Sequence, residues 1–173
     1  MSLTKITETA LYLTFRLEKE LFAIDVVQVR EILDLCTITK VPCAPEFLKG
    51  VINVRGSVVP VVDLRLKFGI TKAEKTMDTR IVVMEILMDG EKIILGAMAD
   101  SVHEVVELEP SQIEDPPTLG ARWRSEFING IGKRGDEFII IIDINRVFSM
   151  DELSFVQNTG EEHRPLEQQA VNV

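Results

Sequence analysis

The chain contains few of the residues that usually build catalytic sites. Only two histidines occur among its 173 residues. His163 lies in a polar C-terminal stretch. His103 follows Asp100 and Ser101 without the strand-turn-helix setting that holds a nucleophilic serine beside its base. A surface position is therefore the preferred interpretation of His103, and no catalytic triad is assembled in the sequence.

Cysteine and long apolar runs are also scarce. Cys36 and Cys43 have no CxxC spacing and no neighbouring histidine, so they do not form a zinc-binding pattern. No run approaches the ~18 apolar residues that span a membrane. The N-terminus, MSLTKITETA, lacks the apolar core and cleavage signature of a secretory signal. These features predict a cytoplasmic protein with reduced thiols that does not insert into a membrane.

Two short patterns come near to ligand-binding motifs but lack required residues. Gly132-Lys133 matches the end of a phosphate-binding loop, but the first glycine of that motif would fall on Phe127 and its Ser or Thr on Arg134. Asp143 and Asn145 lack the glycine and the closing glutamate of a calcium loop. The sequence therefore predicts no catalytic residue, no metal site and no cofactor, which favours a binding module. A small β-barrel hydrolase or other enzyme is the alternative.

Positive charge is in short supply. The formal net charge is −9 and the pI is about 4.8, which argues against nucleic acid or an anionic membrane as the partner. Residues 1–69 carry 9 Lys and Arg against 8 Asp and Glu, whereas residues 70–173 carry 10 against 20. The acidic second half is either an ordinary solvated surface or a sign that the less acidic half faces an acidic partner.

What the chain does contain is a pattern of short β-branched runs. Within residues 47–69, the runs 50–54 and 57–62 flank a corner at Arg55-Gly56. Runs of this kind broken by glycine are typical of paired strands. Asp63 follows the second run, where a carboxylate is suited to cap a turn.

This pattern returns in residues 127–148, which indicates an internal duplication. Four pairs of landmarks are 80 residues apart: Phe47 and Phe127, Gly50 and Gly130, Asp63 and Asp143, Phe68 and Phe148. The corner returns 79 residues later as Arg134-Gly135. An earlier block returns 73 residues later and matches Val29 with Val102, Glu31 with Glu104, and Ile32 with Val105. Two copies are too few for a solenoid, so they predict two related subdomains packed on each other.

Local patterns predict mostly strands. Alternating or β-branched runs predict strands at 11–17, 21–24, 37–41 and 138–142, the last of them buried. Asp89-Gly90 predicts a hairpin that joins 80–88 to 91–98. Residues 107–119 are predicted to form a loop.

Three short helices are also predicted. Asp25 is suited to cap a helix, and the spacing of Val26, Val29 and Leu33 predicts an amphipathic helix with Glu31 on its polar side. Residues 100–105 would be the corresponding helix or helical turn of the second copy. Residues 151–157 predict a terminal helix.

Each copy thus holds about five short strands, too few for a useful two-sheet sandwich. Closure into a small barrel removes the free edges of such strands. We therefore predict a mainly β fold of two small five-stranded SH3-like β-barrels side by side, with short helices. The predicted divisions are a flexible N-terminus (1–10), a first barrel (11–69), a linker (70–79), a second barrel (80–157) and a disordered tail (158–173).

Arg55 is the strongest candidate for a functional side chain. It occupies a tight corner between two strands, where its guanidinium can reach a carboxylate of a partner. It can equally pair with Glu31 and order the corner. Both interpretations stay open at this point and are compatible with each other.

Residues 47–68, FLKGVINVRGSVVPVVDLRLKF, preceded by FAIDVVQVREIL, resemble the CheW-like family of bacterial chemotaxis coupling proteins. The resemblance runs from about Leu11 to Gln157 and includes TKVPCAPEFLKG and EFINGIGKRGDEFIIIIDINRVF. The Asn53-x-Arg55-Gly56 corner followed by VVPVVDLR is specific to this family and to the matching regulatory domain of the histidine kinase CheA. No kinase, phosphotransfer or receiver segment fits in this length, so the resemblance is to the stand-alone coupling protein.

The resemblance implies two SH3-like barrels and a cytoplasmic, non-catalytic adaptor at membrane-associated receptor arrays. Its partners would be a CheA-type histidine kinase and the cytoplasmic tip of methyl-accepting chemoreceptors, with the receptor helix in a groove between the subdomains. Val29, Glu31 and Arg55 match family positions tied to receptor binding. Lys49 and Val58 are the candidates for kinase binding. Related coupling proteins also serve other arrays, such as those of twitching motility.

Overall fold

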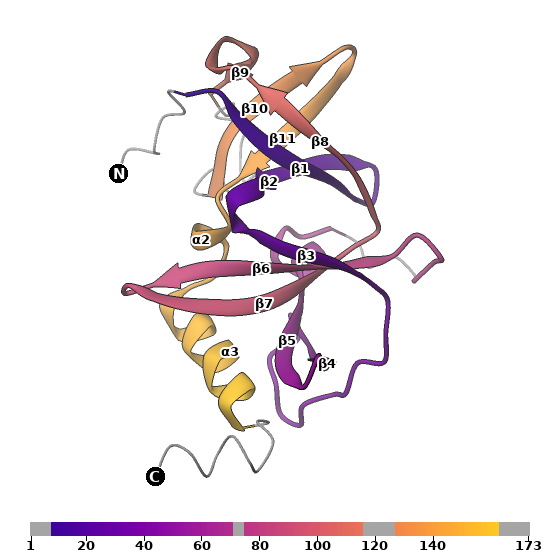
Figure 1. The fold of residues 1–173 in the computed structure, drawn as a ribbon, viewed down its shortest axis with the longest axis vertical. Coiled ribbons are helices and arrows are strands. Elements are labelled where there is room, and N and C mark those ends of the chain that lie inside the picture. The colour runs from indigo at the N-terminus through magenta and orange to yellow at the C-terminus, as the bar shows by residue number, and fades with distance from the viewer. Residues whose placement is uncertain (1–7, 71–74, 116–126, 163–173) are drawn as a thin grey trace.

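The computed structural model describes residues 8–70, 75–115 and 127–162 (Figure 1). Within these residues the chain forms two β-sheets, some short helices and one longer helix, α3 (Met150–Glu162). Figure 1 shows one sheet in the upper half of the molecule and the other in the lower half, with α3 beside the lower sheet. The predicted mainly β fold is confirmed.

The upper sheet, called barrel A below, has six strands in the order β8-β1-β2-β11-β10-β9. They are β1 (Ala10–Leu17), β2 (Glu20–Asp25), β8 (Ser101–Leu108), β9 (Ile113–Glu114), β10 (Ile128–Arg134) and β11 (Glu137–Ile142). The lower sheet, barrel B, has the order β3-β6-β7-β5-β4. Its strands are β3 (Val29–Asp34), β4 (Leu48–Val54), β5 (Ser57–Asp63), β6 (Arg80–Met88) and β7 (Glu91–Ala99). The short helices are η1 (Val26–Gln28), α1 (Leu64–Lys67), η2 (Pro110–Gln112) and α2 (Ile144–Val147).

Each sheet approaches closure because the segment that leaves one edge reaches the opposite edge. After β3, Thr39 forms an isolated bridge with Val51 of β4. After β8, the chain passes through η2 into β9, which pairs with β10. The two sheets are thus small barrels, as predicted. Barrel A has a sixth strand because the returning segment forms a two-residue strand there, whereas in barrel B it forms only a bridge.

The barrels do not follow the predicted boundaries 11–69 and 80–157. The N-terminal hairpin β1–β2 pairs with β8 and β11, and the hairpin β6–β7 pairs with β3 and β5. The two copies have therefore exchanged their first hairpins. As a result, residues 29–99 hold every strand of barrel B, and barrel A is built from the strands on both sides of this stretch.

The duplication itself is visible in the hydrogen bonds. The backbone N–H of Asp63 donates to Phe47 and that of Asp143 donates to Phe127, both at 2.8 Å. Each aspartate then caps the short helix that follows it, because its side chain accepts from the N–H two residues further on. Both copies also carry a bulge just before the repeated glycine.

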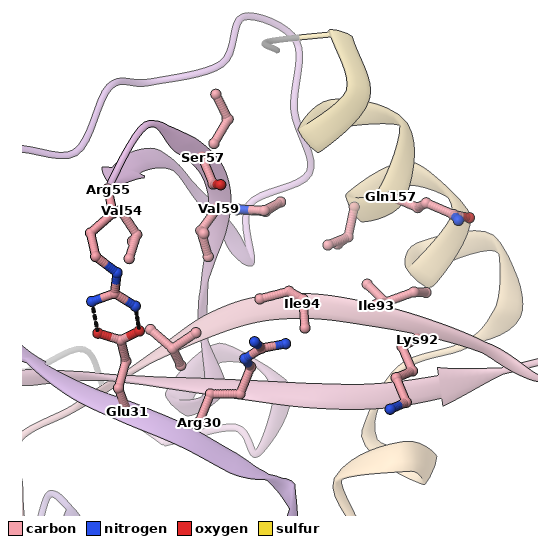
Figure 2. Close-up of a pocket in the computed structure, with 14 residues that line it drawn as sticks. Arg30, Glu31, Val54, Arg55, Ser57, Val59, Lys92, Ile93, Ile94 and Gln157 are labelled. Carbon is pink, nitrogen blue, oxygen red and sulfur yellow. Dashed lines mark hydrogen bonds and ion pairs between the residues drawn. The ribbon is translucent and has the colours of Figure 1, made fainter. Parts of the chain in front are cut away.

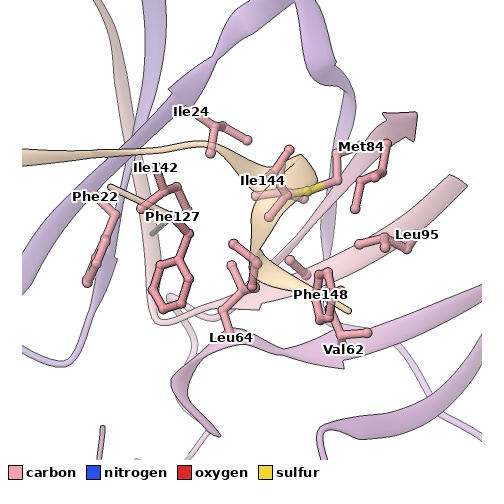
Figure 3. Close-up of a cluster of buried hydrophobic side chains, with 14 of the residues drawn as sticks. Phe22, Ile24, Val62, Leu64, Met84, Leu95, Phe127, Ile142, Ile144 and Phe148 are labelled. Carbon is pink, nitrogen blue, oxygen red and sulfur yellow. The ribbon is translucent and has the colours of Figure 1, made fainter. Parts of the chain in front are cut away.

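The largest hydrophobic cluster lies between the barrels rather than inside one of them. Figure 3 shows Phe22 and Ile142 of barrel A at one side of this cluster and Val62 and Leu95 of barrel B at the other. Two smaller clusters fill the barrel interiors. Strands such as β11 are buried on both faces, because alternate isoleucines point to the shared cluster and to the barrel interior. The predicted burial of 138–142 holds except at Phe138, which is 58% exposed.

Two predicted helices are strands. Asp25 does cap a helical turn, and its carboxylate accepts from Val27 N–H at 3.0 Å, but that turn ends at Gln28. The rest of the predicted helix is β3, and the helix or helical turn predicted at 100–105 is strand β8 from Ser101 onward. The apolar spacing that predicted a helix also suits a strand with a bulge, and β3 has one between Val29 and Glu31.

The remaining local predictions have mixed outcomes. The strands at 11–17 and 21–24 and the hairpin at Asp89-Gly90 are confirmed. The strand predicted at 37–41 is reduced to the Thr39 bridge, and the described part of the predicted loop 107–119 contains the end of β8, η2 and β9. The terminal helix is confirmed, but it extends to Glu162, so the predicted disordered tail begins too early. Residues 163–173 and 116–119 lie outside the described residues.

Candidate functional site

The Asn53-x-Arg55-Gly56 corner is a tight turn between β4 and β5 that is held by its own side chains. The Asn53 side-chain oxygen accepts from Gly56 N–H at 2.8 Å. Arg55 and Gly56 both have positive φ, at 49° and 87°. Glycine adopts this conformation without strain, whereas arginine adopts it only where the surroundings stabilise it. The asparagine thus fixes the turn, and the turn fixes the direction of Arg55.

Arg55 forms a two-pronged ion pair with Glu31, which extends from β3 at the opposite edge of the same sheet (Figure 2). Arg55 Nη1 donates to Glu31 Oε1 at 2.9 Å, and Nη2 donates to Oε2. The Arg55 hydrogen bond lowers the pKa of Glu31, and the same bond raises the pKa of Arg55. The Arg55 side chain is still 75% exposed, against 24% for Glu31. The predicted pair exists, and it presents an oriented guanidinium to solvent.

This pair stands at one end of a groove with a volume of about 540 Å³ (Figure 2). The β4–β5 hairpin forms one side of the groove, and α3 forms the other. Its lining is apolar at Val54, Val58 and Ile94, all partly exposed, and carries the cations Arg30 and Lys92. The groove therefore combines an apolar floor with a charged rim.

The five predicted site residues are not grouped in space by the partner to which the resemblance assigned them. Glu31 and Arg55, predicted for receptor binding, and Val58, predicted for kinase binding, line the same groove. Val29 packs instead against the cluster between the barrels. Lys49 extends toward buried Asp63, with its Nζ 3.5 Å from a carboxylate oxygen, and its side chain is only 18% exposed.

A second ion pair repeats the first one on barrel A. Arg134, at the β10–β11 corner, donates to Glu104 of β8 at 2.5 Å. The two residues are the counterparts of Arg55 and Glu31 at the offsets of 79 and 73. The offsets alone could have predicted this pair. No comparable signal exists for Arg30, Lys92 and the groove wall on α3, because distant segments bring them together.

A buried ion network joins the barrels at the other end of β5 from the Arg55 corner. Arg65 of α1 contacts Asp63 and Asp100, both at 3.0 Å, and Asp100 also accepts from Glu18 N–H in the β1–β2 turn at 2.5 Å. Burial alone would raise the pKa of Asp63, but the hydrogen bond and charge of Arg65 outweigh burial and lower it. Asp100 therefore serves this network and does not orient the nearby Ser101–His103 hydrogen bond (2.9 Å) as a catalytic acid would.

Metal-binding clusters and membrane-spanning helices are both missing from the described parts of the chain. Among the residues placed there, no three His, Cys, Asp or Glu side chains are grouped so that they could hold a metal ion. Likewise, none of the helices seen in residues 8–70, 75–115 and 127–162 has the length and apolarity to cross a membrane.

Comparison with known proteins gives consistent matches. The model of the CheW-like domain matches residues 11–152. The chemotaxis protein CheW of Klebsiella aerogenes is 33% identical over 155 residues, which cover 88% of this chain and 89% of that protein. The chemotaxis protein CheW of Treponema pallidum is 28% identical over 145 residues, 84% of this chain and 85% of that one. The crystal structure of the scaffolding protein TtCheW from Thermoanaerobacter tengcongensis is similar, with a TM-score of 0.72 and 37% identity over 86% of this chain and 92% of that chain.

Proposed function

Because the chain belongs to the CheW-like domain family and is a non-catalytic chemotaxis adaptor, we propose that it couples chemoreceptors to a CheA-type histidine kinase. Because this family consists of non-catalytic adaptors, the alternative of a small β-barrel enzyme is dropped. The adaptor would work in the cytoplasm, held at membrane-associated receptor arrays by its partners rather than by insertion into the membrane. The observation that carries the proposal is the exposed, oriented Arg55–Glu31 pair beside an apolar groove.

The proposed receptor contacts are Val29, Glu31 and Arg55. Glu31 holds Arg55 in one orientation, and a planar guanidinium held this way can bind a partner carboxylate with defined geometry. Val29 is partly buried between the barrels, and Ile32 on the same strand is 44% exposed. These side chains offer the apolar contact that an amphipathic receptor helix requires.

The proposed kinase contacts are Lys49 and Val58. Val58 is better placed, because its partly exposed side chain lies on the groove floor. The Lys49 ammonium is already directed toward Asp63, so a kinase would reach Lys49 mainly through the outer part of its side chain.

The test compares Arg55→Ala and Arg55→Lys with wild type. An exposed ion pair adds little to stability, so the melting temperature of both variants should stay close to that of wild type. Receptor-dependent kinase activation should fall by about tenfold or more in Arg55→Ala, the effect of removing a central interface arginine. Arg55→Lys should also be impaired, because an ammonium does not reproduce the two-pronged geometry.

Arg134→Ala provides the matched control, since it removes the equivalent pair from the other barrel. We expect a smaller effect there. A large drop in melting temperature for Arg55→Ala would instead identify Arg55 as a structural residue. Normal activation in both Arg55 variants would place the interface elsewhere on the barrels.

A further inference from the structure

Asp100 stands where the chain crosses from one barrel to the other. It is the single residue between β7 of barrel B and β8 of barrel A (Figure 1). One of its carboxylate oxygens, Oδ1, accepts from Arg65 Nη1 at 3.0 Å, and the other, Oδ2, accepts from Glu18 N–H at 2.5 Å. Its own N–H donates to the carbonyl oxygen of Arg16 at 2.9 Å. The contacts of Asp100 with Arg65 and Glu18, called the Asp100 bridge below, link α1, which follows barrel B, with the β1–β2 turn of barrel A.

The barrel B end of this bridge is held in one orientation. Arg65 donates from Nε and Nη2 to the two carboxylate oxygens of Asp63, at 3.0 and 3.1 Å. Asp63 is fully buried, and Arg65 is only 3% exposed. A planar guanidinium that is bound at two points cannot rotate freely, so Arg65 Nη1 points in a fixed direction toward Asp100.

The barrel A end of the bridge is also well held. Glu18 has a positive φ of 59° in the β1–β2 turn, and a residue other than glycine adopts this conformation where its surroundings stabilise it. Arg16 Nη1 donates to the Lys19 carbonyl oxygen across the same turn at 3.2 Å. The hairpin carries the rings of Phe15 and Phe22 into the cluster between the barrels. The bridge therefore fixes the position of this hairpin against barrel B.

The equivalent joint of the other repeat is neutral. Asn145, the counterpart of Arg65 at the offset of 80, accepts from Leu87 N–H at 3.1 Å and from Gln28 Nε2 at 3.4 Å. The cluster between the barrels is apolar, and apolar contact has no preferred direction. The Asp100 bridge therefore supplies a charged, directional contact between the barrels that the cluster and the neutral joint lack.

We propose that Asp100 and Arg65 are positioning residues for coupling: their bridge fixes the angle between the barrels, so that a receptor bound at the junction acts on a kinase bound to barrel B. The inference rests on the proposed coupling function. The proposed receptor contact Val29 packs against the cluster between the barrels, whereas the Arg55 corner lies at the far end of β5 from Asp63. A displacement at the junction reaches that corner undiminished only if the barrels and β5 move as one body.

The test removes the bridge and keeps the fold. Asp100→Asn leaves one acceptor oxygen, so the side chain can hold Arg65 or the Glu18 N–H but not both. Because Arg65 keeps both bonds to Asp63, the melting temperature should stay near that of wild type. Activation of a purified CheA-type kinase by a chemoreceptor cytoplasmic fragment should fall by about fivefold or more, the lower end of the usual coupling between two sites. The affinity for each partner alone should stay within about twofold.

Asp100→Glu is the conservative variant, and it should recover much of the activation. It keeps both carboxylate oxygens, and the Asp100 side chain is 22% exposed, which leaves room for one more methylene. Asp34→Asn is the matched control. It removes an exposed ion pair with Arg80 that lies within barrel B, so it should leave activation unchanged.

The angle between the barrels is measured separately, as a distance between two spin labels by pulsed electron paramagnetic resonance. Native Cys36, exposed after β3, carries one label in a Cys43→Ser background. Asp136→Cys, at the exposed β10–β11 corner, carries the other. The distance distribution should be narrow with Asp100 in place and should broaden in Asp100→Asn, whereas Asp34→Asn should leave it unchanged.

The outcomes separate the inference from the proposed function. Wild-type protein that binds neither partner would overturn the proposed function. Normal activation in Asp100→Asn, with or without a broader distance distribution, would show that the bridge does not serve coupling. Reduced activation with an unchanged distribution would show that Asp100 does not act through the angle between the barrels. A large fall in melting temperature would make Asp100 a structural residue, and the inference would fail.

Discussion

At the scale of single residues, Gly50 shows how closely the two edges of barrel B approach each other. Its φ is +148°, and a Cβ at this position would lie 2.1 Å from the carbonyl oxygen of Thr39. Thr39 and Val51 form the bridge that brings the segment after β3 to the edge of β4. Glycine at position 50 is therefore required by the closure of the barrel, in addition to the bulge beside it.

We predict that Gly50→Ala lowers the free energy of unfolding by about 3 kcal/mol or more, because the backbone of Thr39 must move and the bridge is lost. Gly135→Ala is the matched control. Gly135 also has positive φ, at 60°, but nothing lies within 4 Å of its added Cβ, so only the conformational penalty of about 1 kcal/mol applies. Urea unfolding of the two variants measures the difference. Equal losses would show that the contact with Thr39 is not what requires glycine.

At the scale of elements, the two short helices α1 and α2 show how the barrels are joined. Each follows the last strand of its repeat and begins at a capping aspartate. Two residues after the cap, Arg65 reaches Asp100, whereas its counterpart Asn145 accepts from Leu87 N–H of β6 at 3.1 Å. The first contact joins α1, which follows barrel B, to the residue just before β8 of barrel A, and the second joins α2, which follows barrel A, to β6 of barrel B. The first is ionic and the second is neutral, although the backbone around them is duplicated.

Asp63→Asn tests the ionic contact, because asparagine can still cap α1 but cannot neutralise Arg65. We predict a loss of about 3 kcal/mol at neutral pH, since a buried guanidinium loses its fully buried carboxylate partner and keeps the more exposed Asp100 as a charged partner. The folded-state pKa of Asp63 lies below its ordinary value of 3.8. The charged pair therefore stabilises the wild type fully above that pH and progressively less as the pH falls below it.

Consequently, the stability difference between wild type and Asp63→Asn should narrow as the pH is lowered below about 3.8. Urea unfolding from neutral to acidic pH measures this difference. Asp143→Asn is the control at the equivalent cap, where Arg146 is further away, at 3.6 Å, and partly exposed. We expect a smaller loss there. A difference that stays constant across the pH range would mean that Asp63 does not act through its charge.

The same scale shows where sequence patterns predict structure and where they do not. Strands with repeated glycine and aspartate landmarks were predictable, because those residues set turns and caps through local geometry. The Arg55–Glu31 pair was predictable as a possibility, although Glu31 was assigned to a helix and lies on a strand. The amphipathic helix predicted from Val26, Val29 and Leu33 could not be excluded from the local sequence alone, because the same spacing suits a strand with a bulge. Pairing of β3 with β6, about 50 residues away, decides its conformation.

At the scale of the whole molecule, the exchanged hairpins make the halves of the chain interdependent. The segment before the linker holds β1 to β5, and the segment after it holds β6 to β11, so neither contains a complete sheet. The exchange was not predictable from the repeats, since each hairpin has the pattern to pair with either copy. The shared cluster between the barrels adds to this dependence, because it draws on both segments.

Cleavage in the linker between residues 70 and 75 should therefore give two fragments that do not fold separately. Each purified fragment should lack cooperative thermal unfolding by circular dichroism, and an equimolar mixture should recover it, because only together do they supply both sheets. The intact chain under the same conditions is the control. A fragment that unfolds cooperatively by itself would show that a half-set of strands is enough to form a stable domain.

The placement of all strands of barrel B within residues 29–99 also has a consequence for inheritance. Recombination between genes of two related adaptors at a single crossover in the linker would produce a protein with two mosaic barrels, each with strands from both parents. Two crossovers, one at η1 and one at Asp100, would instead transfer barrel B as an intact cassette, together with the Arg55 corner and its partner Glu31. The segment that can be exchanged without loss of strand pairing is therefore residues 29–99. A single repeat cannot be exchanged in this way, because its strands pair with those of the other repeat.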